Sequence, residues 1–119
     1  MEITTTFRDM PVSPALQAAA ERWGARLEQV CDRIVGCHVS IEKPHRHHHH
    51  GSPFQINITL AVPGASIVVS NQMNDDAYVA LADAFRAARR QLIDHVDLQR
   101  GFVKPPAGGR YTGFVASKA

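Results

Sequence analysis

Four stretches of the chain alternate between hydrophobic and polar residues, the pattern of a β-strand with one buried face. They cover residues 2–7, 35–42, 54–62 and, more briefly, 67–70. The third is the most regular, and the dipeptide Pro63-Gly64 that follows it is typical of a tight turn. We therefore expect the fourth strand to run antiparallel to the third.

Two further segments repeat hydrophobic residues every three or four positions, which predicts amphipathic helices. The first helix is expected over about residues 14–32, where Ser13 can serve as N-cap and a proline occupies the first helical position. Gly24 lies inside it and costs about 1 kcal/mol relative to alanine. The second helix is expected over about residues 76–96, and its acidic start suits the positive end of the helix dipole.

The predicted order is β-α-β-β-β-α, which indicates an α+β fold. The long helical connection between the first two strands favours a parallel pair, and the later connections are hairpins. Each helix has one hydrophobic stripe, so we expect a four-stranded mixed sheet with both helices packed on one face. The periodicity stops near Asp97. Residues 1–97 are therefore expected to form the domain, and residues 98–119, which contain Pro and Gly, a flexible C-terminal tail.

Composition excludes several classes of protein. The chain has 119 residues, 45% of them hydrophobic and 20% charged, which fits one globular domain. No apolar run approaches the roughly 18 residues that cross a bilayer, and the N-terminus shows no signal-peptide pattern. Cys31 and Cys37 form neither a CxxC motif nor a disulfide framework, so we expect two reduced thiols and a cytoplasmic location.

The formal net charge is only +2, so any nucleic-acid site must come from where the charges lie. The helical arginines fall in two groups, Arg22, Arg26 and Arg33 with the first helix and Arg86, Arg89 and Arg90 with the second. Helical spacing places each group beside or opposite the hydrophobic stripe of its helix. Two interpretations stay open: solvated helix faces, or two adjacent helices whose guanidinium groups grip phosphates bidentately.

The predicted loop between the second and third strands carries a basic run, His45, Arg46 and His47 followed by three further histidines to His50. Its internal position argues against a purification-tag remnant. Three interpretations remain: imidazoles that bind a metal such as zinc, side chains of His45, Arg46 and His47 that approach RNA, or a plain solvated loop.

No motif for nucleotide binding, metalloprotease chemistry or serine hydrolysis occurs in the sequence. The sequence also shows no pattern that pairs a general acid with a general base for catalysis. We therefore expect a protein that is not an enzyme, with no cofactor and no small-molecule substrate.

Several short motifs resemble one protein family in collinear order over about residues 1–96. Ser13-Pro14-Ala15-Leu16, Arg26-Leu27-Glu28 and Asp32-Arg33-Ile34 resemble the first helix of ribosome hibernation-promoting factors, ribosome-associated inhibitors also called sigma modulation proteins. Further resemblance lies in Val62-Pro63-Gly64, Asp76-Ala77-Tyr78, Arg90-Gln91-Leu92 and, for a His-rich branch of the family, Pro44-His45-Arg46-His47-His48. By this resemblance we expect a short form of the family, without the dimerisation domain of long members.

The resemblance implies a factor of ribosome hibernation and stress response that binds the decoding channel of the small ribosomal subunit. There it would contact rRNA and exclude messenger and transfer RNA sterically. Arg26, Arg33 and Arg90 match basic positions of the family, whereas Arg22, Arg86 and Arg89 are added from the helix faces. Trp23, Gln29 and Ala87 stand where the family usually has lysines, which predicts lower affinity and a shallower salt dependence.

Two alternatives stay open. A general RNA-binding module is one, because the double-stranded RNA-binding domain has a related α-β-β-β-α order without the leading strand. A metal-binding interaction protein acting through His45 to His50 is the other. Neither a membrane nor a homo-oligomer is implied, although an exposed sheet edge could pair two copies.

Overall fold

The six predicted elements occur in the predicted order in a computed structural model of the chain, of which residues 1–44 and 53–101 are described here. The strands are β1 (Glu2–Arg8), β2 (Gly36–Glu42), β3 (Phe54–Val62) and β4 (Ala65–Asn74). They form one sheet in the order β1-β2-β3-β4. β1 pairs with β2 in parallel and the other two pairs are antiparallel, so the predicted mixed sheet is confirmed.

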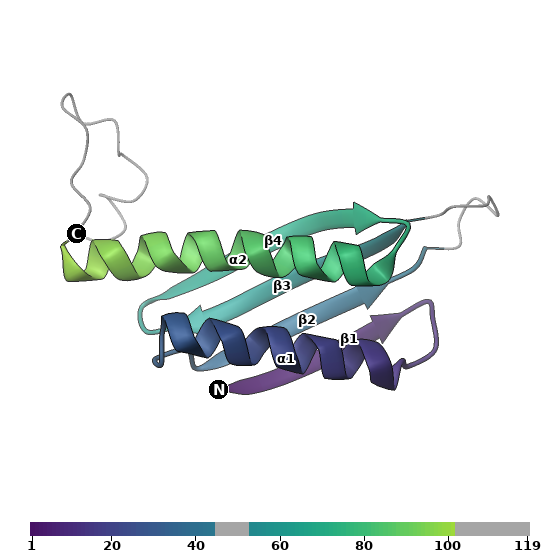
Figure 1. Cartoon of the computed structure of the whole chain (residues 1–119), viewed down its shortest axis with the longest axis horizontal. Helices are drawn as coiled ribbons and strands as arrows, with labels where there is room; N and C mark the ends of the chain where they lie inside the picture. Colours follow the sequence, from purple (N-terminus) through teal and green to yellow (C-terminus); the bar gives the residue numbers. More distant parts are fainter. Residues whose placement is uncertain (45–52, 102–119) are drawn as a thin grey trace, which may run out of the picture.

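Both helices cover the same face of this sheet (Figure 1), which confirms the predicted α+β layering. α1 (Pro14–Val30) lies beside α2 (Ala77–Arg100), and α2 packs on β3 and β4. The strand that a double-stranded RNA-binding domain lacks, β1, pairs with β2 along its whole length. It is therefore an integral part of the sheet.

The fourth strand is longer than predicted, since it continues to Asn74 rather than ending at residue 70. The alternation ends early because the pairing with β3 shifts by one residue between Ile56 and Ile58. Asn71 adopts a positive φ of 60° at this bulge, and its backbone N–H donates to the Asn57 side chain at 2.8 Å. A bulge of this kind moves the following side chains to the opposite faces, so the hydrophobic pattern breaks off while the strand continues.

The helix ends also differ from the prediction. α1 begins as expected, with the Ser13 hydroxyl accepting from the Leu16 N–H at 3.2 Å, but it ends at Val30 because Cys31 is already extended. α2 continues to Arg100, four residues beyond the predicted end, and Gly101 caps it in the left-handed conformation with φ 76°. The rest of the predicted tail, residues 102–119, lies outside the described residues.

The core lies between the sheet and the helical layer. Alternate residues of β2 and β3 are fully buried and meet the hydrophobic stripes of the helices, in which Leu27, Leu81, Phe85 and Leu92 are at most 1% exposed. At the turn between β3 and β4, Gly64 has a φ of 79°, the value that the second central residue of a type II turn requires. The expected two-residue hairpin is thus present.

No helix of the described residues covers the opposite face of the sheet (Figure 1). Most of the side chains on this face are polar, although Val68 and Met73 of β4 are exposed there as well. Thr6 Oγ1 and His38 Nε2 lie 2.9 Å apart, and the Gln55 side chain donates to Asn71 Oδ1 at 2.6 Å. Several of the polar side chains on this face therefore bond to one another. No helix among the described residues is long and apolar enough to cross a membrane.

Candidate nucleic-acid interface

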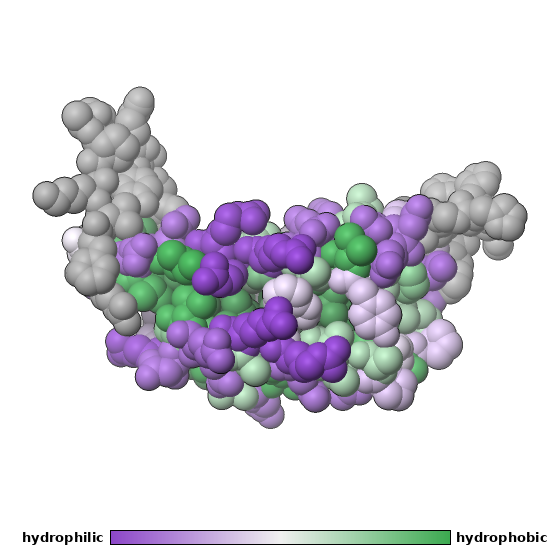
Figure 2. Space-filling view, viewed as in Figure 1, coloured by the Kyte–Doolittle hydropathy of each residue, from purple (hydrophilic) through white to green (hydrophobic). Residues whose placement is uncertain are grey.

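The outer side of the helical layer carries the arginines that the sequence singled out. Figure 2 shows strongly hydrophilic side chains along both helices, on either side of the boundary between them. A more hydrophobic area lies toward the C-terminal ends of the helices in the same view. The expected side-by-side arrangement of two arginine-bearing helices is therefore present.

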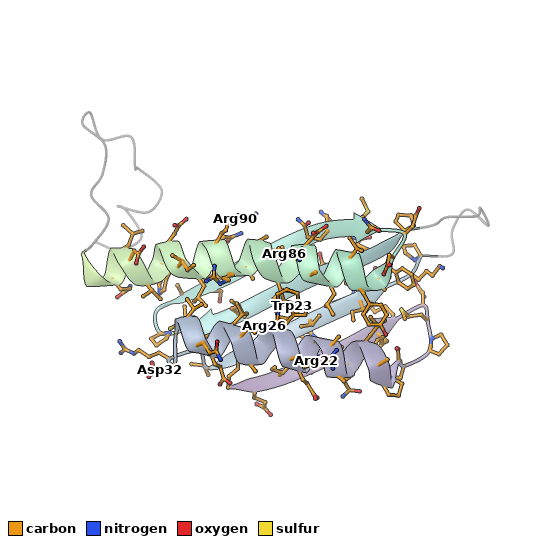
Figure 3. The ribbon with its side chains drawn as sticks, in the orientation of Figure 1. Arg22, Trp23, Arg26, Asp32, Arg86 and Arg90 are labelled. Atoms are coloured by element: carbon orange, nitrogen blue, oxygen red, sulfur yellow. The ribbon has the colours of Figure 1, made fainter. Side chains whose placement is uncertain are left out.

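Trp23 sits at the boundary between the helices (Figure 3). Its ring stacks on Phe85 of α2, with centroids 6.0 Å apart and an interplanar angle of 11°. The Arg26 guanidinium carbon lies 4.7 Å from the centroid of the Trp23 ring, and that of Arg86 lies 5.6 Å from it. One indole therefore holds a guanidinium group from each helix within cation–π distance.

The neighbouring arginines complete a basic surface on the two helices. Arg22 and Arg90 are exposed, and both lie on the outer side of the helical layer (Figure 3). Arg89 is exposed as well. Arg86 forms an ion pair with Asp83, N to O 3.2 Å, in which both side chains are about half exposed, so the pair does not bury the guanidinium. The five helical arginines Arg22, Arg26, Arg86, Arg89 and Arg90 form what we call the arginine surface.

Arg33 is not part of this surface. The sequence placed it on the stripe of Arg22 and Arg26, but α1 ends at Val30, and Arg33 belongs to the connection before β2. There it lines a cleft of about 400 Å³ at the C-terminal ends of the helices, together with Cys31, Val62, His95 and Val96. The error arose because Ile34 continues the helical spacing although the backbone has already turned toward the sheet.

The remaining predicted contacts, His45, Arg46 and His47, lie outside the described residues, as does the whole His45 to His50 run. Within residues 1–44 and 53–101, no group of three or more His, Cys, Asp or Glu side chains could hold a metal ion. The metal-binding alternative therefore depends entirely on that run.

Both cysteines are free thiols. Cys37 is buried in β2, and this burial raises the pKa of its thiol from 9.0 to about 11. A thiol held neutral in this way is a poor nucleophile, because the thiolate is the reactive form. Cys37 therefore belongs to the core rather than to a reactive site.

The sequence did not predict that Trp23 contacts arginines of both helices. Trp23 was assigned to the hydrophobic stripe of the first helix, and it does contact the core through Phe85. Its spacing from Arg26, three residues on one helix, was the available indication of a contact. The contact with Arg86 depends on the tertiary packing of two helices and has no local signature.

The sequence was compared with models of protein families and with curated proteins. Residues 3–100 match the family model described as sigma 54 modulation protein / S30EA ribosomal protein. None of the curated proteins compared matches the sequence.

Two solved structures are similar in fold. The structure of a ribosomal subunit interface protein from Coxiella burnetii has a TM-score of 0.68 and 21% identity, covering 81% of this chain and 98% of that one. The N-terminal domain of Thermus thermophilus Protein Y has a TM-score of 0.67 and 20% identity, covering 79% of this chain and 98% of that one.

Proposed function

The chain belongs to the sigma 54 modulation protein / S30EA ribosomal protein family, and we propose that it binds the decoding channel of the small ribosomal subunit through rRNA phosphates. In that position it would exclude messenger and transfer RNA sterically and hold the ribosome in an inactive state. Steric exclusion needs no catalytic residue. It needs only a folded domain of the right size with a surface that binds RNA. We take the protein to act as a hibernation factor rather than as an enzyme.

The observation that carries the proposal is the arginine surface. All five side chains are exposed on two adjacent helices. Figure 3 shows four of them, Arg22, Arg26, Arg86 and Arg90, on the helical layer that covers one face of the sheet. RNA presents a regular array of phosphates, and arginine binds phosphate oxygens through a planar fork of N–H donors. A rigid pair of helices that spaces several guanidinium groups can therefore follow an RNA backbone.

The distribution of charge strengthens this argument although the net charge is small. Glu21 and Glu28 are exposed on α1 but lie on the flank of that helix opposite Arg22 and Arg26. Negative and positive side chains are thus separated around the helix. On α1, a phosphate approaching the arginine surface therefore meets mainly cations, which a net charge of +2 does not reveal. On α2 the exposed carboxylate of Asp83 is paired with Arg86.

The other sequence-based contacts remain part of the proposal. Arg33, at the end of the helical layer, and the loop residues His45, Arg46 and His47 would extend the contact area beyond the arginine surface. The division into a ribosome-binding domain and a C-terminal segment is kept as well. None of these additions is needed for the main prediction, which depends on α1 and α2.

Co-sedimentation with purified small ribosomal subunits across a salt series tests the proposal. Reversal of Arg26, Arg33 and Arg90 together to glutamate is expected to abolish association while the thermal unfolding midpoint stays close to that of the wild type. Neutralising a single phosphate-binding arginine should reduce the slope of log K against log salt by about 0.7–0.9. Unchanged co-sedimentation of the triple variant would contradict the site.

Arg8→Glu is the matched control, because Arg8 is exposed at the end of β1 and lies on the open face of the sheet with Thr4 and Thr6. It changes the net charge as much as Arg26→Glu does but on the other side of the sheet. We expect Arg26→Glu to weaken binding clearly more than Arg8→Glu. Equal weakening by both variants would indicate a nonspecific charge effect.

Competition separates this function from general RNA binding. Messenger and transfer RNA bound to the subunit should displace the protein, whereas a free RNA duplex should compete poorly. A duplex that competes as well as intact small subunits would favour a general RNA-binding module.

A further inference from the structure

We propose that Trp23 is a positioning residue that holds Arg26 and Arg86 together as one phosphate-binding pair, with one guanidinium from each helix on the same RNA backbone phosphate. The inference rests on the proposed function, since it concerns contacts within that interface. It goes further by assigning a role to an aromatic residue and by identifying the ligand group, a phosphodiester, at a defined place on the surface.

The two guanidinium groups share one ring. Their central carbons lie 4.7 and 5.6 Å from the Trp23 centroid, so they cannot be further apart than the sum of these distances. Arg26 follows Trp23 by one turn of α1, whereas Arg86 comes from α2. The indole is thus the point at which cations from the two helices meet.

The ring is itself fixed in place. It stacks on Phe85, which is fully buried and directly precedes Arg86 in α2. Because Phe85 belongs to the core and both arginines are exposed, the indole separates the core from the two charges. A ring anchored in this way gives each guanidinium a defined surface to rest on.

Pre-ordering matters because an arginine side chain carries considerable rotamer entropy, part of which disappears when it binds a ligand. An arginine that already lies over a ring has given up some of this freedom before RNA arrives. The cation–π contact therefore lowers the entropic cost of binding as well as stabilising the free protein.

The charge balance favours an anion at this point. Two guanidinium groups near one ring repel each other, and among the described residues the only carboxylate in an ion pair with either is Asp83, bound to Arg86. One carboxylate against two cations leaves one positive charge uncompensated. A phosphodiester, with a single negative charge and two free oxygens, supplies the missing charge and an acceptor for each guanidinium.

Two substitutions of Trp23 separate positioning from packing. Trp23→Phe keeps an aromatic face, whereas Trp23→Leu keeps a hydrophobic side chain without one. If Trp23 orders both arginines, Trp23→Leu should weaken association with small ribosomal subunits roughly five- to thirtyfold and Trp23→Phe should restore most of it. Unfolding curves of both variants establish that the domain is folded at the assay temperature.

The decisive comparison is a double-mutant cycle. In a background of Arg26→Gln and Arg86→Gln, the change Trp23→Leu should no longer affect the affinity, because there is nothing left to position. An equal reduction of affinity in both backgrounds would show a merely structural role and overturn the proposal. So would a wild-type affinity of Trp23→Leu, although the proposed function would still stand.

A second readout does not depend on the ribosome. Trp23 is the only tryptophan in the chain, so its fluorescence reports on this site alone. Titration with a short single-stranded oligoribonucleotide should change the emission saturably in the wild type and not in the Arg26→Gln, Arg86→Gln variant. Absence of any change in the wild type would overturn the arginine pair even if subunits bind elsewhere on the protein.

Discussion

Gly24 of α1 lies directly over Ile3 of β1, so that a β-carbon at position 24 would overlap the terminal methyl group of Ile3. The backbone of α1 therefore approaches the edge of the sheet more closely than any other residue at this position would allow. The glycine that weakens the helix locally is explained by this approach, which the sequence alone does not show.

Substitution at this position tests the contact. Alanine at position 24 should gain up to about 1 kcal/mol in helix propensity, but this gain should be offset because the Ile3 side chain must move. In an Ile3→Val background, which lacks the overlapping methyl, Gly24→Ala is expected to raise the free energy of unfolding. Urea unfolding of the four proteins should give an interaction energy of roughly 0.5 kcal/mol or more. Additive effects would show that the two residues are not coupled.

The N-cap of α2 provides a test of local stability. The Asp76 carboxylate accepts hydrogen bonds from the backbone N–H groups of Tyr78 and Val79 at 2.8 and 3.4 Å. Asp76→Ala should therefore lower the free energy of unfolding by about 1 kcal/mol. Asp75→Ala removes the same charge from the exposed neighbouring position and should have a clearly smaller effect. Thermal unfolding of the two variants measures the difference, and equal shifts would contradict capping by Asp76.

Buried Cys37 predicts a specific dependence of stability on pH. An ordinary thiol in the unfolded chain ionises near pH 9.0, whereas the folded protein keeps the proton until about pH 11. Between these values the folded state binds more protons than the unfolded state, so the free energy of unfolding should fall as pH rises. Its contribution to the slope is at most about 1.4 kcal/mol per pH unit.

Cys37→Ala removes this component, so its stability should decline less between about pH 9 and about pH 10.5 than that of the wild type. Urea unfolding in the presence of a reducing agent measures both proteins. Parallel pH profiles would show that the thiol ionises equally in the folded and unfolded states.

Asp83 should limit the affinity of the arginine surface, because it is paired with Arg86 and lies near any phosphate bound there. Asp83→Asn is expected to strengthen binding to small subunits about twofold or more, since two unit charges at ~10 Å in water interact by roughly 0.4 kcal/mol. The effect on stability should stay below about 1 kcal/mol, as for other exposed ion pairs. Co-sedimentation at low and high salt checks this, and weaker binding by the variant would argue against phosphate at this place.

The sequence was sufficient for the strands and helices because alternation and helical periodicity are local properties. The sequence did not predict where β4 and α1 end, because tertiary structure determines these two ends. The end of β4 follows from pairing with β3 across a bulge at Asn71, and the end of α1 follows from the extended Cys31 that leads the chain into β2. Neither event changes the composition of the segment in which it occurs.

In the candidate site, too, the local pattern predicted some features, and tertiary packing decided others. Helical spacing alone predicted that Arg22 and Arg26 share a face and that Arg86, Arg89 and Arg90 lie outside the hydrophobic stripe. It also placed Arg33 on the helix, which was wrong because α1 ends at Val30. The meeting of Arg26 and Arg86 over one indole requires a defined packing of two helices, and no pattern within either helix encodes it.

Site-specific photo-crosslinking to the ribosome tests most directly which face of the protein binds RNA. A photoreactive amino acid replaces Arg22 on the arginine surface in one variant and Thr59, exposed on the open face of the sheet, in another. We predict crosslinks to small-subunit rRNA from position 22 and few or none from position 59. Crosslinks to that rRNA from position 59 and none from position 22 would place the interface on the sheet and contradict the account.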